Sequence, residues 1–177
     1  MTEDVEPLET ERADAPSASG VSVPDASSWT DPLTGADGPR LWDRLLSSET
    51  ARCRRYHRPA TVALVEFIGL DDLVRAWGPA ISERTFVRQA RTLATEIRSS
   101  DHIARIERTR FAILLTETDE IAAINFVERV RAAFERQPGE LRIALGWASP
   151  TAKTDLHDAL SIAERRLLDE IGDDAAD

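Results

Sequence analysis

The spacing of hydrophobic residues changes several times along the chain, and these changes predict an alternation of helices and strands. Apolar residues recur at helical spacing in five segments, residues 40–57, 70–78, 82–98, 119–136 and 155–170. Short apolar runs typical of buried strands occupy residues 61–67, 102–106, 111–116 and 141–148. The four polar residues between the second and third runs predict a β-hairpin there.

The predicted order is one helix followed by β-α-α-β-β-α-β-α. This order matches the split βαβ plan of ferredoxin-like folds, with an additional helix at the start. Helical crossovers join the strands on both sides of the predicted hairpin, which favours helices packed on a sheet. The pattern therefore predicts an α/β (α+β) domain with a mixed sheet and flanking helices.

The helical segments also predict which side chains enter the core. Residues Phe86, Ala90, Leu93 and Ile97 form one apolar stripe. In the same way, the segment 119–136 is expected to bury Ile121, Ile124, Val127 and Phe134. Three tryptophans are interpreted as core residues, Trp42, Trp77 and Trp147.

Composition divides the chain into three parts. Residues 1–30 hold seven acidic residues and one basic residue, Arg12, together with many Ser, Ala and Pro residues. We interpret this segment as a disordered acidic tail because it offers little apolar surface to bury. Residues 31–171 are expected to form one folded domain, and residues 172–177 a short acidic C-terminal tail. We expect no further domain besides the tails. We therefore expect a regulatory signal to reach the folded domain through a ligand or a partner.

The net charge and the rarity of cysteine argue against several functional classes. A formal charge of −10 disfavours nucleic-acid binding, which relies on a positive field. No apolar run approaches the roughly 18 residues of a membrane helix, and the acidic start is unlike a signal peptide. The single cysteine, Cys53, excludes an intramolecular disulfide and fits a reducing compartment. We therefore expect a cytoplasmic protein that binds neither membranes nor nucleic acids.

Five short segments occur in an order and at a spacing that resemble a known family. They are DPLTG at 31–35, ALVEF at 63–67, the stretch at 98–115, FVERVR at 126–131 and IALGWA at 143–148. Together they resemble the GGDEF domain, the catalytic domain of bacterial diguanylate cyclases, over residues 31–170. The resemblance implies a GGDEF-type fold.

The hairpin that carries the GGDEF residues in that family is altered here. Its position is filled by a segment of which only the phenylalanine agrees with the family, Glu107, Arg108, Thr109, Arg110 and Phe111. Glycines allow a phosphate to approach the backbone closely, and the side chains of Glu107 and Arg108 would fill that space. The resemblance implies a carboxylate metal ligand where Arg110 stands, and a guanidinium has no lone pair to donate.

Other positions of the implied active site have also changed. Glu66 corresponds to the metal-binding acid of the first strand, and the next acid of the family corresponds to Ile68. Glu83 replaces an aspartate implied in guanine recognition. Because one carboxylate cannot hold two magnesium ions, we expect a vestigial site with no metal, no cofactor and no cyclase activity. Glu66 and Arg110 should lie on adjacent strands, either paired with each other or both directed to solvent.

A second motif of the family is retained. Arg98 and Asp101 match the RxxD motif that binds cyclic di-GMP in active members, and Arg129 matches a further arginine of that site. Arginine presents a planar fork to guanine O6 and N7, and aspartate accepts hydrogen bonds from guanine N1–H and N2–H. The alternative is an inert ion pair on the surface. Two such sites could share stacked ligands between chains, so a homodimer is plausible.

Two functions from different classes remain open. The first is a cyclic di-GMP-binding effector that changes its contact with a partner protein. The second is a protein-interaction scaffold that uses no nucleotide. A basic cluster near the first helix could dock an acidic partner or the chain's own acidic tail, or could be a solvated helix face, and comprises Arg52, Arg54, Arg55, His57 and Arg58.

Overall fold

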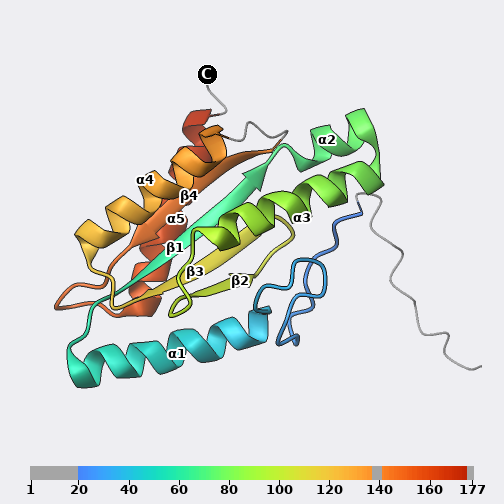
Figure 1. Cartoon of the computed structure of the whole chain (residues 1–177). Helices are drawn as coiled ribbons and strands as arrows, with labels where there is room; N and C mark the ends of the chain where they lie inside the picture. The colour runs from blue at the N-terminus through green and yellow to red at the C-terminus, as the bar shows by residue number, and fades with distance from the viewer. Residues whose placement is uncertain (1–19, 137–140, 175–177) are drawn as a thin grey trace, which may run out of the picture.

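The computed structural model describes residues 20–136 and 141–174. Every predicted element is present, with ends within a few residues of those expected (Figure 1). The helices are α1 (Pro39–Tyr56), α2 (Leu70–Trp77), α3 (Pro79–Thr95), α4 (Glu120–Arg136) and α5 (Leu156–Asp174). The strands are β1 (Ala60–Ile68), β2 (His102–Arg105), β3 (Arg110–Thr116) and β4 (Arg142–Ala148).

The four strands form one sheet in the order β2-β3-β1-β4. The split βαβ plan is thereby confirmed, because β3 lies between β1 and β2. Each of the three neighbouring pairs is antiparallel, so the expectation of a mixed sheet is wrong. The helical crossover does place β1 and β2 parallel to each other, but β3 separates them and pairs antiparallel with both.

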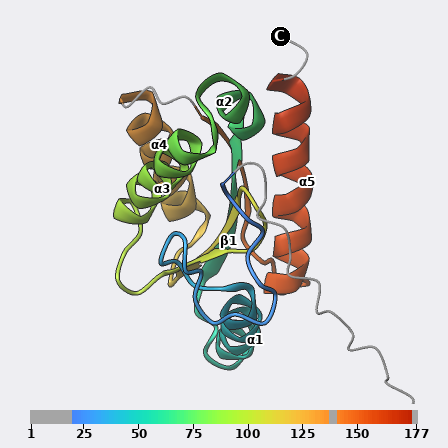
Figure 2. The same cartoon turned by 90° about the vertical axis from the view of Figure 1, so that its right-hand side faces the viewer.

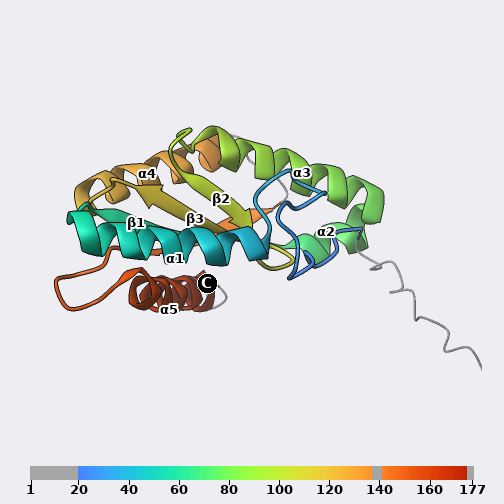
Figure 3. The same cartoon turned by 90° about the horizontal axis from the view of Figure 1, so that it is seen from below.

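Helices cover both faces of the sheet. Helices α3 and α4 lie over one face, and α1 and α5 lie over the other (Figures 2 and 3). The α3–α4 face is built around four phenylalanine rings, Phe67, Phe86, Phe111 and Phe134, and the centroids of the rings in contact lie 5.4–5.9 Å apart. The predicted stripe of α3 faces this core, with Phe86, Ala90 and Leu93 buried.

Helix α5 approaches the sheet closely at Gly146 of β4. A Cβ atom at this position would lie 2.0 Å from the Ala163 carbonyl oxygen and 2.5 Å from the Leu167 amide nitrogen. Both atoms belong to the backbone of α5 and cannot move independently of the helix. The glycine therefore sets the distance between α5 and β4.

The structure moves the N-terminal boundary of the domain. Val21 is fully buried, and Thr30 forms an isolated bridge with Asp37. Residues 20–30 therefore belong to the folded domain and are not a disordered tail as expected. At the other end, α5 continues through residues 172–174, where a tail was predicted. The remaining predicted tail residues, 1–19 and 175–177, lie outside the described residues.

Two predictions about buried side chains are wrong. Trp77, at the C-terminal end of α2, is 62% exposed, whereas Trp42 is buried and Trp147 partly buried. Helix α4 exposes Ile121 (73%) and Ile124 (43%). It buries Phe134 as predicted, but the rest of its buried face consists of Ala123, Phe126, Val130 and Ala133. No helix among the described residues has the length and apolar character needed to cross a bilayer.

Candidate functional site

The β2–β3 hairpin brings Arg110 opposite Glu66. The two residues are partners in the β1–β3 register, and the Arg110 Nε donates to the Glu66 Oε2 over 2.7 Å. Their side chains are 13% and 14% exposed. The predicted pair is confirmed, and the alternative in which both side chains point to solvent is excluded. An arginine–carboxylate pair at this burial neutralises the Glu66 charge without a metal.

Further groups surround this pair. The Thr109 hydroxyl donates to the other Glu66 oxygen, Oε1. The Arg110 Nη1 lies 2.9 Å from the Glu107 Oε1 and 3.7 Å from the Glu164 Oε1 of α5. Both oxygens of Glu66 are therefore engaged, and a fixed cation stands between the carboxylates. These residues do not fit a divalent metal, and no cluster of three or more potential metal ligands occurs within residues 20–136 and 141–174.

Arg108 joins the hairpin to the N-terminal segment and to α2. Its Nε donates to the Val21 carbonyl over 3.2 Å, and its Nη2 donates to the Asp71 carboxylate of α2 over 2.8 Å. This hydrogen bond holds the pKa of Asp71 below its ordinary value. Arg108 thus occupies space where the resemblance implied an open glycine backbone. Glu83 is half-buried on α3, and no hydrogen bond among the described residues joins it to the hairpin.

A buried ion pair lies behind the hairpin, and the sequence analysis did not identify it. Arg105 is completely buried, and its Nη1 lies 3.0 Å from the Asp31 Oδ1. The same guanidinium donates to the carbonyls of Ser22 and Arg108 and lies over the Phe86 ring. Burial lowers the pKa of Arg105. The pair anchors the N-terminal segment to the edge strand β2.

The three residues of the RxxD-like site come together. Arg98 lies in the turn after α3, and the Asp101 N–H donates to the Arg98 carbonyl over 3.0 Å. Arg98, Asp101 and Arg129 all line one small hollow, which Leu115 and Phe126 also line. The enclosed volume is only about 10 Å³, room for about one water molecule. A larger ligand would therefore lie on the outer surface of these side chains.

Two of these side chains already have protein partners. The Asp101 Oδ1 accepts hydrogen bonds from the Thr116 N–H at 3.1 Å and from its hydroxyl at 3.2 Å. Arg129 donates through Nε to the Glu96 carboxylate and through Nη2 to the Glu96 carbonyl, over 3.1 and 2.8 Å. The guanidinium carbon of Arg129 also lies 5.4 Å from the centroid of the Phe126 ring. These contacts fix the orientation of the two side chains, whereas no hydrogen bond from the described residues holds the exposed Arg98 side chain.

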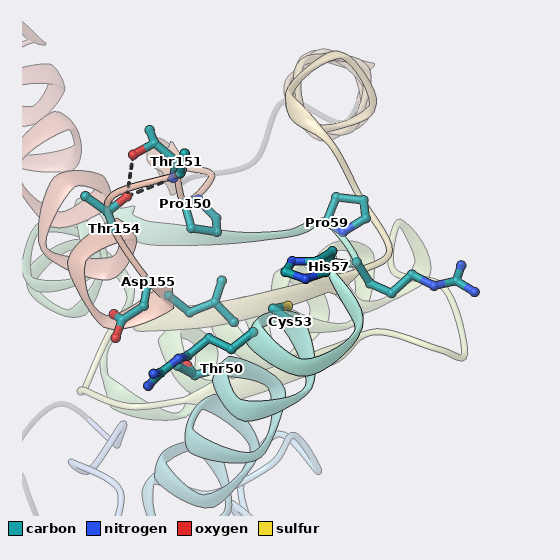
Figure 4. Close-up of a pocket in the computed structure, with 12 residues that line it drawn as sticks. Thr50, Cys53, His57, Pro59, Pro150, Thr151, Thr154 and Asp155 are labelled. Atoms are coloured by element: carbon teal, nitrogen blue, oxygen red, sulfur yellow. Dashed lines mark hydrogen bonds between the residues drawn. The ribbon is translucent and has the colours of Figure 1, made fainter.

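A larger hollow of about 500 Å³ lies between the end of α1 and the loop before α5 (Figure 4). Cys53 and His57 face Pro150 and Asp155 across it. Arg54, His57 and Arg58 of the predicted basic cluster line this hollow, whereas Arg52 is paired with Glu49 and Glu117. The sequence analysis missed the wall formed by Thr151, Thr154 and Asp155, because these loop residues form no recognisable motif.

Comparisons with a family model and with curated proteins identify the same family. The family model "Diguanylate cyclase, GGDEF domain" matches residues 28–169. The probable diguanylate cyclase DgcC of Escherichia coli K12 is 30% identical over 124 residues, which cover 67% of this chain and 33% of that protein. Diguanylate cyclase DosC of the same strain is 24% identical over 145 residues, 77% of this chain and 32% of that protein. The chain thus spans about a third of the length of these curated relatives.

Solved structures with the same fold include a diguanylate cyclase and a separate GGDEF domain. SiaD of Pseudomonas aeruginosa, solved with its activator SiaC, has a TM-score of 0.73 and 25% identity, covering 83% of this chain and 59% of that one. The GGDEF domain of DgcB from Caulobacter crescentus, solved with c-di-GMP, has a TM-score of 0.72 and 16% identity, covering 79% of this chain and 88% of that one. The second similarity concerns the fold alone.

Proposed function

The chain belongs to the GGDEF domain family, and from that premise we propose that it acts in the cytoplasm as a catalytically inactive module that binds cyclic di-GMP. The observation that carries the proposal is the convergence of Arg98, Asp101 and Arg129 on one hollow. These are the residues that the resemblance assigns to cyclic di-GMP binding. Arg98 and Asp101 lie in the turn after α3, and Arg129 lies on helix α4. The fold brings these two segments together.

Each of the three side chains has a chemically suitable role. The exposed Arg98 guanidinium can present two donors to guanine O6 and N7 and stack on the base. The Asp101 Oδ2 accepts no hydrogen bond from the described residues and is available to guanine N1–H and N2–H. Arg129 is held through Nε and Nη2, which leaves its Nη1 for a ligand phosphate.

The proposed lack of cyclase activity rests on the Glu66–Arg110 pair. Phosphoryl transfer requires divalent ions that bridge the phosphates and stabilise the developing charge. Arg110 and Thr109 engage both Glu66 oxygens, and Arg108 covers the hairpin. The chain's own residues therefore offer neither hard oxygen ligands nor an open phosphate site at this position.

Titration calorimetry of the full chain with cyclic di-GMP tests the proposal. We expect micromolar binding that is lost in Arg98→Ala and retained in Arg165→Ala, a control at an exposed arginine of α5. Incubation with GTP and Mg²⁺ should yield no cyclic di-GMP by chromatography. Formation of the product would refute the proposed inactivity, and the absence of binding heat would refute the proposed ligand. Light scattering with and without the ligand tests whether two chains share it as a homodimer.

The second candidate function is a protein-interaction domain that uses no nucleotide. Two exposed isoleucines lie one turn apart on α4, Ile121 and Ile124, next to the hollow lined by Ala122 and Phe126. SiaD, which is 25% identical to this chain, was solved in complex with an activator protein. Ile121→Ser with Ile124→Ser should abolish partner capture if this function holds, and Arg98→Ala should leave capture unchanged.

A further inference from the structure

Helix α3 carries a row of arginines on its exposed side. Arg84, Arg88 and Arg91 follow one another at intervals of four and three residues and are all exposed. The one acidic residue of this helix, Glu83, is half-buried. No carboxylate of the described residues forms an ion pair with Arg84 or Arg91. Arg84 and Arg91 therefore contribute local positive charge to the surface of a chain whose formal charge is −10.

The arginine row continues into a hollow between α3 and α4. This hollow has a volume of about 320 Å³, and its lining includes Arg88, Arg91 and Arg136 together with Thr92 and Thr95. The one acidic residue of the lining, Glu96, already accepts hydrogen bonds from Arg129. We call the row and this hollow together the α3 groove. The groove offers the exposed guanidinium groups of Arg84 and Arg91, and a guanidinium binds carboxylates, whereas the Thr92 and Thr95 hydroxyls already donate to carbonyls of α3.

The chain contains an acidic segment that begins beside this groove. Residues 1–19 hold six acidic residues and one basic residue, Arg12, for a formal charge of −5. The segment joins the fold at Gly20, where an added Cβ would lie 2.8 Å from the carbonyl oxygen of Pro79, the first residue of α3. Figure 1 shows the described chain starting near this end of α3.

The segment is long enough to follow the groove. Nineteen residues reach up to about 60 Å when extended, whereas a helix of 17 residues is about 25 Å long. The acids at positions 3, 4, 6, 9, 11 and 14 are spread over most of this length. Because the segment is tethered at the start of the row, its effective concentration at the groove reaches the millimolar range.

We propose that the acidic segment 1–19 docks in cis on the α3 groove of the same chain. The association is electrostatic, so it weakens as salt shortens the Debye length from about 10 Å at 0.1 M to about 3 Å at 1 M. The docked segment shields the arginines from other anionic molecules. The inference concerns a surface separate from the RxxD-like residues and does not depend on cyclic di-GMP binding.

Paramagnetic broadening tests the proposal in the full chain. A nitroxide is attached at Thr10→Cys in a Cys53→Ser background, and amide signals are compared with those of the reduced label. We expect the strongest broadening at residues 88–95 and 133–136. The broadening should disappear in 1 M salt and in the neutral-segment variant E6Q/E9Q/E11Q/D14N, which changes no residue of the described fold.

Two charge reversals locate the contact. The triple variant R84E/R88E/R91E should abolish the broadening, whereas R54E/R55E/R58E on the basic cluster near α1 should leave it unchanged. Uniform broadening, or broadening centred on residues 54–58, would overturn the proposal. A mixture of labelled unenriched chain and unlabelled ¹⁵N-enriched chain tests contact between molecules. Broadening of comparable strength in that mixture would also overturn docking in cis.

Discussion

Arg110 of β3 lies directly across from Glu66 of β1 and donates to its carboxylate over 2.7 Å. The two side chains are mostly buried, so their interaction is screened less than that of a surface pair. A charge buried without a partner is costly, and the pair removes that cost for both residues. The hairpin thus holds an internal ion pair that needs no ligand at the position where the family resemblance implies a metal-binding carboxylate.

Removing the cation alone should destabilise the domain. Arg110→Met leaves the Glu66 carboxylate half-buried with Thr109 as its donor, and we expect the free energy of unfolding to fall by about 2 kcal/mol. The double variant E66Q/R110M should recover most of that loss because it removes the unpaired charge. Urea unfolding followed by circular dichroism measures both. Equal losses in the single and double variants would show that the unpaired Glu66 charge is not the cause of the destabilisation.

The buried Arg105–Asp31 pair should matter more for stability. Asp31→Ala leaves a fully buried guanidinium without its carboxylate and also removes the acceptor for the Thr34 N–H and hydroxyl. We expect a loss of about 3–5 kcal/mol. Hydrogen exchange at residues 21–31 should accelerate at the same time, because the pair anchors this segment. Asp43→Ala, at an exposed position of α1, is the control and should change neither quantity.

Gly146 should tolerate no side chain. Gly146→Ala places a methyl group against backbone atoms of α5 that cannot move separately, and we expect a loss of about 3 kcal/mol or more. Gly172→Ala lies within α5 and meets no atom within 4 Å, so it should raise stability by about 1 kcal/mol. Thermal unfolding of the two variants makes the comparison. Equal behaviour of the two variants would show that α5 can shift away from β4.

The hydrophobic pattern was sufficient to predict the elements, but only some of the faces they bury. The α3 stripe was predictable because Phe86, Ala90 and Leu93 repeat at helical spacing while arginines fill the opposite side. Helix α4 has apolar residues on two sides. The side that faces the core contains small residues such as Ala123. A prediction from hydrophobicity alone places the larger Ile121 in the core instead.

The Glu66–Arg110 pair was predictable because strand order and register follow from the family pattern. The Arg105–Asp31 pair was not, since its members are 74 residues apart and Asp31 stood next to a presumed tail. One signal could have indicated it. Arg105 stands in the sequence between the apolar residues Ala104 and Ile106, and a charged residue buried there requires a partner. Val21 gave no comparable signal, because its neighbours have the composition of a disordered segment.

The last prediction separates two roles of Asp101, a structural acceptor for Thr116 and a ligand for guanine. Asp101→Asn keeps an oxygen that can accept from the Thr116 N–H, so stability should stay within about 1 kcal/mol of the parent. The variant loses the charged acceptor for guanine N1–H and N2–H, so affinity for cyclic di-GMP should fall at least about tenfold, or about 1.4 kcal/mol.

Thr116→Val provides the matched change on the structural side. It removes the hydroxyl that donates to Asp101 and to the Ser100 carbonyl, so we expect a loss of about 1 kcal/mol in stability and an affinity within about threefold of the parent. Calorimetric titration and urea unfolding of the same preparations measure both quantities. If Asp101→Asn lowers stability without changing affinity, then Asp101 is only the structural acceptor at the start of β2. In that case Arg98 and Arg129 alone would have to account for any cyclic di-GMP binding.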